Sequence, residues 1–494
     1  MGRAEDKDAI IARQAAEIAA LRRESTQLRA ENAQLWAENA RLREANARLE
    51  ARVEALERRL GMNSRNSSQP PSRDGPQTPP PPSRPPSPRK PGGQPGHEGH
   101  QRTLLPPEQV DRIIAVKPKT CGRCGRRLVG DDPAPRRHQV WDLPPVKPTV
   151  TEYQRHALSC PACGHVTPAD LPEGVPASAF GPGVVAVTAM LTGGLHASKR
   201  AAQVMLTEVF HVPASLGAVS ACEEQASEAL AAPVAEAHAY VQKQAVGYAD
   251  ETGWKEGNRR RAWLWALVTA LVTAFRIHAR RGGEAARALL GVFRGVLVSD
   301  RWGAYNVHEG RRQVCWAHLK RDFVGFSEAR GEAGRIGREL LAETRKMFSW
   351  WYRVRDGTVG RERFQARMKA LQGRVEALLE EGALCPHAAV ANSCLEILKH
   401  QNALWTFVRE EGVEPTNNAA ERALRPAVLW RKGSFGTQSA RGSRFVERVL
   451  TAYATCRQQR RSIVDYLTQA CQARLHGRPA PSLLPPPRLA ASKA

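Results

Sequence analysis

Three short motifs, far apart in the chain, each place an acidic residue among Trp, Asn or Arg residues. They are Y-A-D-E-T-G-W at 248–254, L-V-S-D-R-W-G-A-Y at 297–305 and N-N-A-A-E-R-A-L-R at 417–425. Together they offer Asp250, Asp300 and Glu421 as one carboxylate triad. Because hard divalent cations prefer oxygen ligands, three carboxylates at one place could hold a pair of metal ions.

The segments around the first two acids predict the strands and the helix of a sheet. Apolar runs at 245–250 and 295–300 each end on an aspartate, further strands are expected at 262–268 and 273–279, and 283–290 is helical by pattern. Strand ends in an α/β sheet open onto the ligand crevice, so both aspartates would face that crevice. This order of elements indicates an RNase H-like core within an α/β multidomain chain.

Two adjacent acids, Asp250 and Glu251, compete for the first position of the triad. Side chains alternate along a strand, so Asp250 shares a face with Val246 and Tyr248, while Glu251 lies on the other face. We therefore select Asp250.

The third acid is expected on a helix that begins near Pro415 and Thr416. Asn417, Glu421 and Arg425 would then share one helical face, and the helix could present the carboxylate across the edge of the sheet. The alternative for each of the three acids is a solvated or arginine-paired side chain with no part in chemistry.

These motifs resemble those of the IS66 type of bacterial insertion-sequence transposases, which have a D-D-E catalytic core. The resemblance spans nearly the whole chain and includes G-G-Q-P-G-H-E-G-H at 92–100, the four-cysteine region, C-W-A-H-L-K-R-D-F at 315–323, E-P-T-N-N-A-A-E-R-A-L-R-P at 414–426 and R-K-G-S-F-G-T-Q-S-A-R-G at 431–442. It implies Asp250, Asp300 and Glu421 as the catalytic acids, and a helical insertion before the last of them.

The activity implied by the resemblance is metal-dependent DNA cleavage followed by strand transfer. Two Mg²⁺ (or Mn²⁺) ions held by the three acids would activate the attacking oxygen and stabilise the leaving oxygen, with water attacking first and the freed 3′-hydroxyl second. Asn417, Arg422 and Arg425 are candidates to orient the glutamate or to bind the scissile phosphate.

Two other functions share parts of this pattern. A nuclease that cuts without joining would have the same triad, and a zipper and zinc transcriptional regulator with an inactive core would have the same N-terminal segments. The zipper described below favours the pairing of two DNA ends over simple cutting. The three intact acids disfavour the regulator.

The charge of the chain agrees with double-stranded DNA as its partner. The 494 residues have a formal net charge of +24 and a pI near 10.2. Residues 1–60 are nearly balanced, with twelve Lys and Arg against eleven Asp and Glu, whereas 422–478 contain twelve basic residues and two acids. Such an excess attracts phosphate backbones through counterion release, so we expect a DNA-contacting C-terminal face.

The first segment has the heptad pattern of a leucine zipper. Six leucines recur at d positions and three consecutive a positions are asparagine: Leu21, Leu28, Leu35, Leu42, Leu49 and Leu56, with Asn32, Asn39 and Asn46. Polar a positions fix the register of a parallel pair but weaken it. We expect a homo-oligomer through this coiled coil; the alternative is a single amphipathic helix that docks on its own protein.

Two Cys-x-x-Cys pairs predict a structural zinc site. Cys121 with Cys124, and Cys160 with Cys163, are each followed by Gly and match the two knuckles of a zinc ribbon. Four thiolates would complete a tetrahedral Zn²⁺ site with no open position for catalysis. The alternative is four free thiols.

The segment between the cysteines and the first acid is helical by pattern. Helices at 198–210 and 216–228 around a turn at 211–213 are typical of a helix-turn-helix, in which Lys199 and Arg200 would lie near phosphate. A generic helical bundle would show the same periodicity.

The pattern of apolar residues indicates no membrane partner. Residues 1–60 are charged throughout, and the longest apolar stretch, 262–275, is too short to span a bilayer. We expect the protein in the bacterial cytoplasm, on the nucleoid, where its cysteines stay reduced. Cys315 and His318 have ligand-like spacing, which we interpret as packing beside the second catalytic strand.

These features divide the chain into successive segments. They are a leucine-zipper coiled coil (1–62), a disordered Pro-rich linker (63–102), a zinc-binding domain (103–175), a helical DNA-binding domain (176–244), the first part of the RNase H-like core (245–322), a helical insertion (323–412), the last part of the core with basic C-terminal helices (413–478) and a disordered tail (479–494). Accessory proteins of the same element are further candidate partners.

Overall fold

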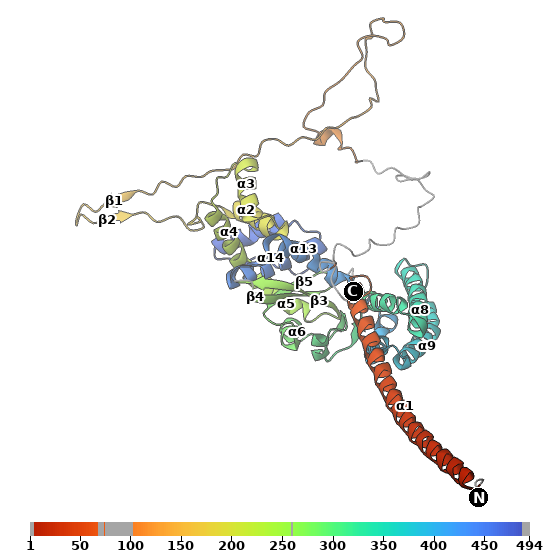
Figure 1. Cartoon of the computed structure of the whole chain (residues 1–494). Helices are drawn as coiled ribbons and strands as arrows, with labels where there is room; N and C mark the ends of the chain where they lie inside the picture. The colour runs from red at the N-terminus through yellow and green to blue at the C-terminus, as the bar shows by residue number, and fades with distance from the viewer. Residues whose placement is uncertain (1–3, 68–73, 75–101, 258–259, 487–494) are drawn as a thin grey trace. The chain divides into compact units, whose positions relative to one another are not determined.

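The structure is a computed structural model that describes residues 4–67, 74, 102–257 and 260–486. Most of the linker expected at 63–102, and the end of the tail expected at 479–494, lie outside the described residues. The chain forms two compact units (Figure 1). We call residues 79–312 with 417–494 the sheet unit, and residues 1–78 with 313–416 the helical unit.

A mixed sheet forms the centre of the sheet unit, which confirms the mixed α/β class. Its strands in spatial order are β5 (Thr273–His278), β4 (Arg260–Val268), β3 (Val246–Glu256), β6 (Val296–Ser299) and β7 (Arg312–Val314). Strands β3, β4 and β5 are antiparallel, and β6 runs parallel to β3. The helix expected at 283–290 is α6 (Gly283–Leu290), which carries the chain from β5 to β6. The chain enters the helical unit within β7.

One strand is longer than the sequence predicts. The strand expected at 245–250 continues as β3 to Glu256, so Asp250 lies inside the strand and not at its end. The prediction was wrong because β4 pairs with β3 from Tyr248 to Glu256, which supports the extra residues. The parallel pairing of β3 with β6 does end close to Asp250, at Tyr248.

Two helices from the end of the chain pack on this sheet. Helix α13 (Asn418–Ser434) packs against β3 and β4, and α14 (Ala440–Gln458) packs against β5. A third helix, α15 (Ile463–Leu475), follows them. Trp254, Trp265 and Phe275 are among the largest buried side chains of this core. The sheet therefore recruits the segment that contains the third acidic motif.

Helix α14 also satisfies the main-chain N–H groups on the outer edge of the sheet. An unpaired edge strand needs a cover, and β5 is the edge strand here. The pairs of donor and acceptor are Thr273 N–H with Thr455 Oγ1 (3.2 Å), Phe275 N–H with Thr451 Oγ1 (3.1 Å) and Ile277 N–H with Glu447 Oε1 (2.6 Å). The acceptors are four residues apart on α14, a rise of ~6 Å, and the donors are two residues apart on β5, a rise of ~6.6 Å. The two spacings are nearly equal, so each acceptor lies opposite its donor.

Before β3, the sheet unit contains a short antiparallel pair in the cysteine region, β1 (Ala157–Ser159) and β2 (Val166–Pro168), followed by a helical segment. Its elements are α2 (Pro182–Ala189), the π-helical turn η3 (Met190–Gly194), α3 (Lys199–Val204), the π-helical turn η4 (Met205–Val209), α4 (Leu216–Ala229) and α5 (Ala231–Val241). Helical structure is therefore present at 198–210 and at 216–228, with a turn between them, as the pattern predicts.

A short repeat builds two corners of this helical segment. The sequence M-L-T-x-x-L/F-H occurs at 190–196 and at 205–211. Each copy forms a π-helical turn that ends at a histidine with positive φ, 59° at His196 and 54° at His211, and a serine then caps the next helix. His196 stacks on Trp430 of α13, with ring centroids 5.4 Å apart. The first corner thus supports the helix that contains Glu421.

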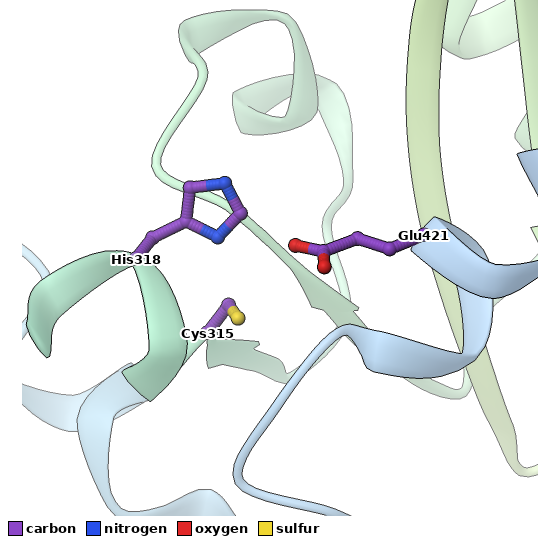
Figure 2. Close-up of side chains that lie close together, drawn as sticks. All are labelled: Cys315, His318 and Glu421. Atoms are coloured by element: carbon purple, nitrogen blue, oxygen red, sulfur yellow. The ribbon is translucent and has the colours of Figure 1, made fainter. Parts of the chain in front are cut away.

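The helical unit consists of α1 and the helices between β7 and α13. Its elements are α1 (Ala4–Gly61), α7 (Trp316–Ser327), α8 (Gly331–Arg355), α9 (Arg361–Leu384), α10 (Ala388–Leu398), α11 (Gln401–Leu404) and α12 (Thr406–Arg409). Trp351, Phe364 and Phe407 pack together in its core. Cys315 is buried just before α7, and His318 lies in the first turn of that helix (Figure 2).

The heptad leucines of α1 are exposed along the helix. Their exposed fractions lie between 47% and 60%. The loop after α1 is attached to the helical unit, because Asn66 Nδ2 donates to Glu328 Oε2 at 2.7 Å. Within the parts of the chain that the structure describes, no helix is both long and apolar enough to cross a membrane.

We expect Thr451→Val to lower the free energy of unfolding by about 1–3 kcal/mol, because the buried N–H of Phe275 then loses its acceptor. Thr451→Ser keeps the hydroxyl group and should lose less. Urea unfolding followed by tryptophan fluorescence measures both variants. Equal stabilities for Thr451→Val and the wild type would contradict the proposed role of the ladder between β5 and α14.

Candidate active site

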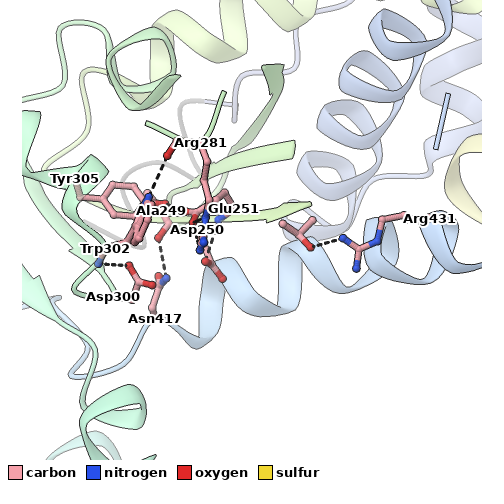
Figure 3. A network of polar contacts seen from close by, with 10 residues as sticks. Ala249, Asp250, Glu251, Arg281, Asp300, Trp302, Tyr305, Asn417 and Arg431 are labelled. Atoms are coloured by element: carbon pink, nitrogen blue, oxygen red, sulfur yellow. Dashed lines mark hydrogen bonds and ion pairs between the residues drawn. The ribbon is translucent and has the colours of Figure 1, made fainter. Parts of the chain in front are cut away.

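The first two acids occupy neighbouring positions on parallel strands. Strands β3 and β6 pair with Tyr248 opposite Val298. The same offset of fifty residues places Asp250 opposite Asp300, the residue that directly follows β6. Adjacent strands are ~4.8 Å apart, so the two carboxylates leave the sheet side by side. Figure 3 shows both side chains in the same polar network.

A buried asparagine brings the third acid to this place. Asn417 directly precedes α13 and is fully buried, and its Nδ2 donates to the main-chain oxygen of Ala249 at 2.8 Å (Figure 3). The N–H of Glu421 in turn donates to the main-chain oxygen of Asn417 at 3.2 Å. Glu421 therefore extends from the first turn of α13 (Figure 2), close to the residue that follows Ala249.

The environment of the first two carboxyl groups opposes their ionisation. Burial raises the pKa of both Asp250 and Asp300, because it removes the water that stabilises their charged forms. The negative charges of Glu251, Asp300 and Glu421 raise the pKa of Asp250 further. Main-chain N–H groups act in the other direction, from Glu251 on Asp250 and from Trp302 on Asp300, each at 2.9 Å. A bound divalent cation would offset the repulsion among these acids.

Glu251, the alternative to Asp250, belongs to a buried ion pair. One of its carboxylate oxygens contacts Arg281 at 2.9 Å, and the other accepts a hydrogen bond from the Tyr305 hydroxyl at 2.5 Å. Its side chain is 1% exposed. Because both oxygens have protein partners, Glu251 is engaged in the fold, whereas the neighbouring Asp250 points to the side of Asp300 and α13 (Figure 3).

The same network fixes the loop that follows Asp300. The guanidinium of Arg281 lies over the rings of Trp263 and Trp302, 4.7 Å and 4.3 Å from their centroids. Trp302 Nε1 donates to the main-chain oxygen of Arg281 at 3.0 Å. Arg312 donates to the main-chain oxygen of Asp300 at 3.1 Å. The aromatic residues of the second motif could have indicated part of this network from the sequence, but nothing in the sequence indicated Arg281.

The two arginines predicted to act with Glu421 lie on the same helix. Arg422 and Arg425 are both exposed on α13. Successive turns carry Asn417, Glu421 and Arg425. Asn417 is fully buried, Glu421 is half-buried and Arg425 is exposed. The face of α13 that contains Glu421 therefore runs from the sheet out to the surface.

The four cysteines form two matching knuckles in the sheet unit. In each, the N–H of the first cysteine donates to the main-chain oxygen five residues later, at 2.8 Å and 2.9 Å, and the glycine after the second cysteine has a φ of 71° or 72°. Main-chain N–H groups lower the pKa of Cys121 and of Cys160, which favours the thiolates that zinc binds. Among the described residues, no three of these thiols, Cys124 and Cys163 included, lie within 4.8 Å of one another.

The two cations predicted to lie near phosphate have different environments. Lys199 Nζ donates to Ser220 Oγ at 2.7 Å and forms an ion pair with Glu223 at 2.9 Å, so it links α3 to α4. Arg200 is exposed on α3. Of the two, Arg200 is the more accessible to a ligand.

We expect Asp250→Asn to raise the thermal unfolding temperature in the absence of divalent cations. A carboxyl group with a raised pKa in the folded state contributes stability at low pH, and that contribution is lost as the pH rises through the raised pKa. The difference between variant and wild type should therefore grow with pH. Mg²⁺ or Mn²⁺ should stabilise the wild type but not Asp250→Asn. Thermal scans across pH measure this, with the exposed Glu309→Gln as control; identical pH profiles for Asp250→Asn and wild type would refute it.

Comparison with known proteins identifies the family of the chain. Residues 178–444, which include all three acids, match the transposase IS66 family. Residues 118–164, which include the four cysteines, match the zinc-finger binding domain of transposase IS66, and residues 17–103 match a family of unknown function, DUF6444. The uncharacterized protein y4qI of Sinorhizobium fredii is 27% identical over 271 residues, which are 47% of this chain and 48% of that protein, so the chain spans about half the length of this relative. Because the IS66 match covers more than half of the sequence, the chain belongs to the IS66 family of transposases.

Proposed function

We propose that the protein is an active D-D-E transposase with an RNase H-like core, which cleaves DNA at the ends of its own insertion sequence and joins those ends to target DNA. The observation that carries this proposal is the grouping of three acids from distant parts of the sequence. Asp250 lies on β3, Asp300 directly follows the parallel strand β6, and Glu421 lies on a helix bound to β3. The antiparallel β3–β4–β5 arrangement with a parallel β6 supports the RNase H-like assignment.

The donor set fits two divalent cations. The site consists of carboxylate oxygens, which Mg²⁺ and Mn²⁺ prefer, and the pKa values of Asp250 and Asp300 are raised, which added positive charge would oppose. Asp250, Asp300 and Glu421 would hold the ions. When bound, such ions activate an attacking oxygen and stabilise a leaving oxygen.

The neighbouring residues have positioning and binding roles in this proposal. Asn417 fixes the start of α13 and so orients Glu421. Arg422 and Arg425, exposed on the same helix, would bind the scissile phosphate, to which a guanidinium can donate two hydrogen bonds. The network of Glu251 and Arg281 would keep Asp300 in place.

Double-stranded DNA is the proposed partner of the sheet unit. The basic segment 422–478 includes α13 and α14, which pack on the sheet, and α15, which packs on α2 and α4. The zinc-finger region and the α3–α4 corner would supply further contacts, with Arg200 preferred over Lys199 because the charge of Lys199 is paired with Glu223. We place this activity on the bacterial nucleoid, with accessory proteins of the same element as further partners.

Helix α1 is proposed to pair in parallel with α1 of a second copy. Its heptad leucines are exposed, and a coiled coil would remove them from water. The loop at Asn66 attaches the end of α1 to the helical unit, so a pair of α1 helices would bring two chains, and thereby two DNA ends, together.

A nuclease without joining activity is the second candidate, because the same acids would serve it. The exposed zipper favours joining, since cutting alone needs no second copy. An inactive DNA-binding regulator is disfavoured. Burial of Asp250 and Asp300 lowers the stability of the folded state, and a protein without catalytic activity would have no use for these two buried acids.

We expect Asp250→Asn, Asp300→Asn and Glu421→Gln each to reduce Mg²⁺-dependent nicking by about 100-fold or more, because each removes a ligand of the metal pair. DNA affinity should change little. The substrate is a plasmid that carries the genomic DNA flanking the coding sequence. Glu309→Gln is the control, because Glu309 is an exposed acid of the same unit paired with Arg294. Nicking by any of the three variants at the wild-type rate would refute the triad.

Deletion of residues 1–60 should leave nicking intact and impair joining, because α1 contributes to the pairing of chains and not to the site. Sedimentation should show a dimer for the full chain and a monomer for the truncated chain. Changing Asn32, Asn39 and Asn46 to Ile should tighten the coil and shift it toward trimers. Joining by the truncated chain at the full rate would show that α1 has another role.

A further inference from the structure

An exposed phenylalanine ends α13 in a backbone conformation that glycine usually adopts. Phe435 has φ 62° and ψ 14°, and its N–H donates to the main-chain oxygen of Arg431 at 2.9 Å. Left-handed backbone is unfavourable for residues with a β carbon, and for a bulky side chain it is an outlier. The side chain is 67% exposed, so packing does not offset this cost. Strained residues of this kind cluster at functional sites.

The two residues after Phe435 are bonded to the end of β3. Thr437 N–H donates to the main-chain oxygen of Lys255, and Gly257 N–H donates to the main-chain oxygen of Thr437, both at 2.9 Å. Gly436 has φ 105°, and a β carbon there would overlap the main-chain oxygen of Lys255. Trp254 Nε1 also donates to Thr437 Oγ1 at 3.2 Å. These hydrogen bonds fix the loop that contains Phe435, whose side chain is exposed to solvent.

The hairpin beside Phe435 contains a second unfavourable arrangement. Lys255 and Arg261 are directly opposite each other on β3 and β4, and both are exposed. Like charges at such positions destabilise a strand pair. The adjacent acid, Glu256, accepts a hydrogen bond from Ser443. Exposed cations lie on the four elements that meet at this loop: Lys255 on β3, Arg260 and Arg261 on β4, Lys432 on α13 and Arg444 on α14.

We propose that Phe435 is a wedge that stacks against an unpaired or unstacked base of DNA, while the surrounding cations bind the phosphates on either side. Apolar side chains are inserted at base steps in this way by proteins that kink DNA, and aromatic rings stack on bases of any sequence. A DNA backbone bound here would place negative phosphates beside Lys255 and Arg261 and so offset the repulsion between these two cations. An apolar protein partner would instead bury these cations without counter-charges, which is costly.

The wedge lies at a defined distance from the proposed catalytic acids. Glu421 and Phe435 are at the two ends of α13, and fourteen residues of helix rise roughly 21 Å. Asp250 and Lys255 are on β3, and five residues of strand extend roughly 17 Å. One base pair takes about 3.4 Å of DNA. The wedge therefore meets the DNA about five or six base pairs from the scissile phosphate. This placement rests on the proposed function.

The test measures binding of the full-length protein to two short duplexes in a buffer without added Mg²⁺ or Mn²⁺ and without chelator, so that cleavage plays no part and structural zinc is retained. One duplex is fully paired, and the other has a single-base bulge with 2-aminopurine beside it. We expect the wild type to prefer the bulged duplex and to change the 2-aminopurine fluorescence. Phe435→Gly should lose about tenfold or more of affinity for the bulged duplex and bind both duplexes equally. It should fold normally, because glycine accepts the left-handed conformation.

Three further variants separate stacking from charge and from general loss of apolar surface. Phe435→Trp should keep the preference. Leu429→Ala removes an exposed apolar side chain of the same helix and should also keep it. Lys255→Ala with Arg261→Ala should weaken binding to both duplexes equally and reduce the salt dependence.

The outcomes separate this inference from the proposed function. If Phe435→Gly still prefers the bulged duplex, or if the wild type binds both duplexes equally, the wedge is overturned. Phe435 would then be expected to contact a protein partner. The triad prediction stands or falls independently in the nicking assay. A wild type that binds neither duplex would overturn the proposed function together with the wedge.

Discussion

The geometry of the candidate active site depends on one buried hydrogen bond, from Asn417 Nδ2 to the main-chain oxygen of Ala249. The chain leaves the sheet unit at β7, and residues 313–416 belong to the helical unit. It returns to the sheet unit at Asn417, whose amide must find a partner because it is buried. That partner adjoins Asp250. The bond therefore sets where α13 begins, and Glu421, one turn later, comes to lie near the first acid.

Aromatic packing and the edge of the sheet reinforce this attachment. Trp430, near the other end of α13, packs on His196, Trp254 and Phe445, with ring centroids 5.4 Å, 6.2 Å and 6.3 Å apart. Helix α14 then supplies acceptors to alternate N–H groups of β5. The returning segment is thus held along its length, so the position of Glu421 is coupled to the folding of the whole sheet.

Two adjacent acids of one strand are both buried but differ in their polar partners. Burial and the charge of Asp300 raise the pKa of Glu251, while its partners, the Tyr305 hydroxyl and the Arg281 guanidinium, act in the other direction. Burial, together with the charges of the neighbouring acids, raises the pKa of Asp250 well above its ordinary value, and only one main-chain N–H acts in the other direction. The fold thus gives the charge of Glu251 an arginine and a hydroxyl as partners, whereas Asp250 has no such side-chain partner that would offset its burial. This cost to stability is typical of residues that are kept for function.

Much of this architecture was determined by the sequence alone. The strands at 262–268 and 273–279, the helix at 283–290 and the two cysteine knuckles were predictable, because periodicity and turn chemistry act between near neighbours. The three acids could be proposed for the same reason, since each lies in its own local motif. Only the tertiary structure decided the extension of β3 past Asp250, the pairing of Glu251 with Arg281 and the partner of Asn417. Each of these depends on contacts between residues far apart in the sequence, which no local pattern specifies.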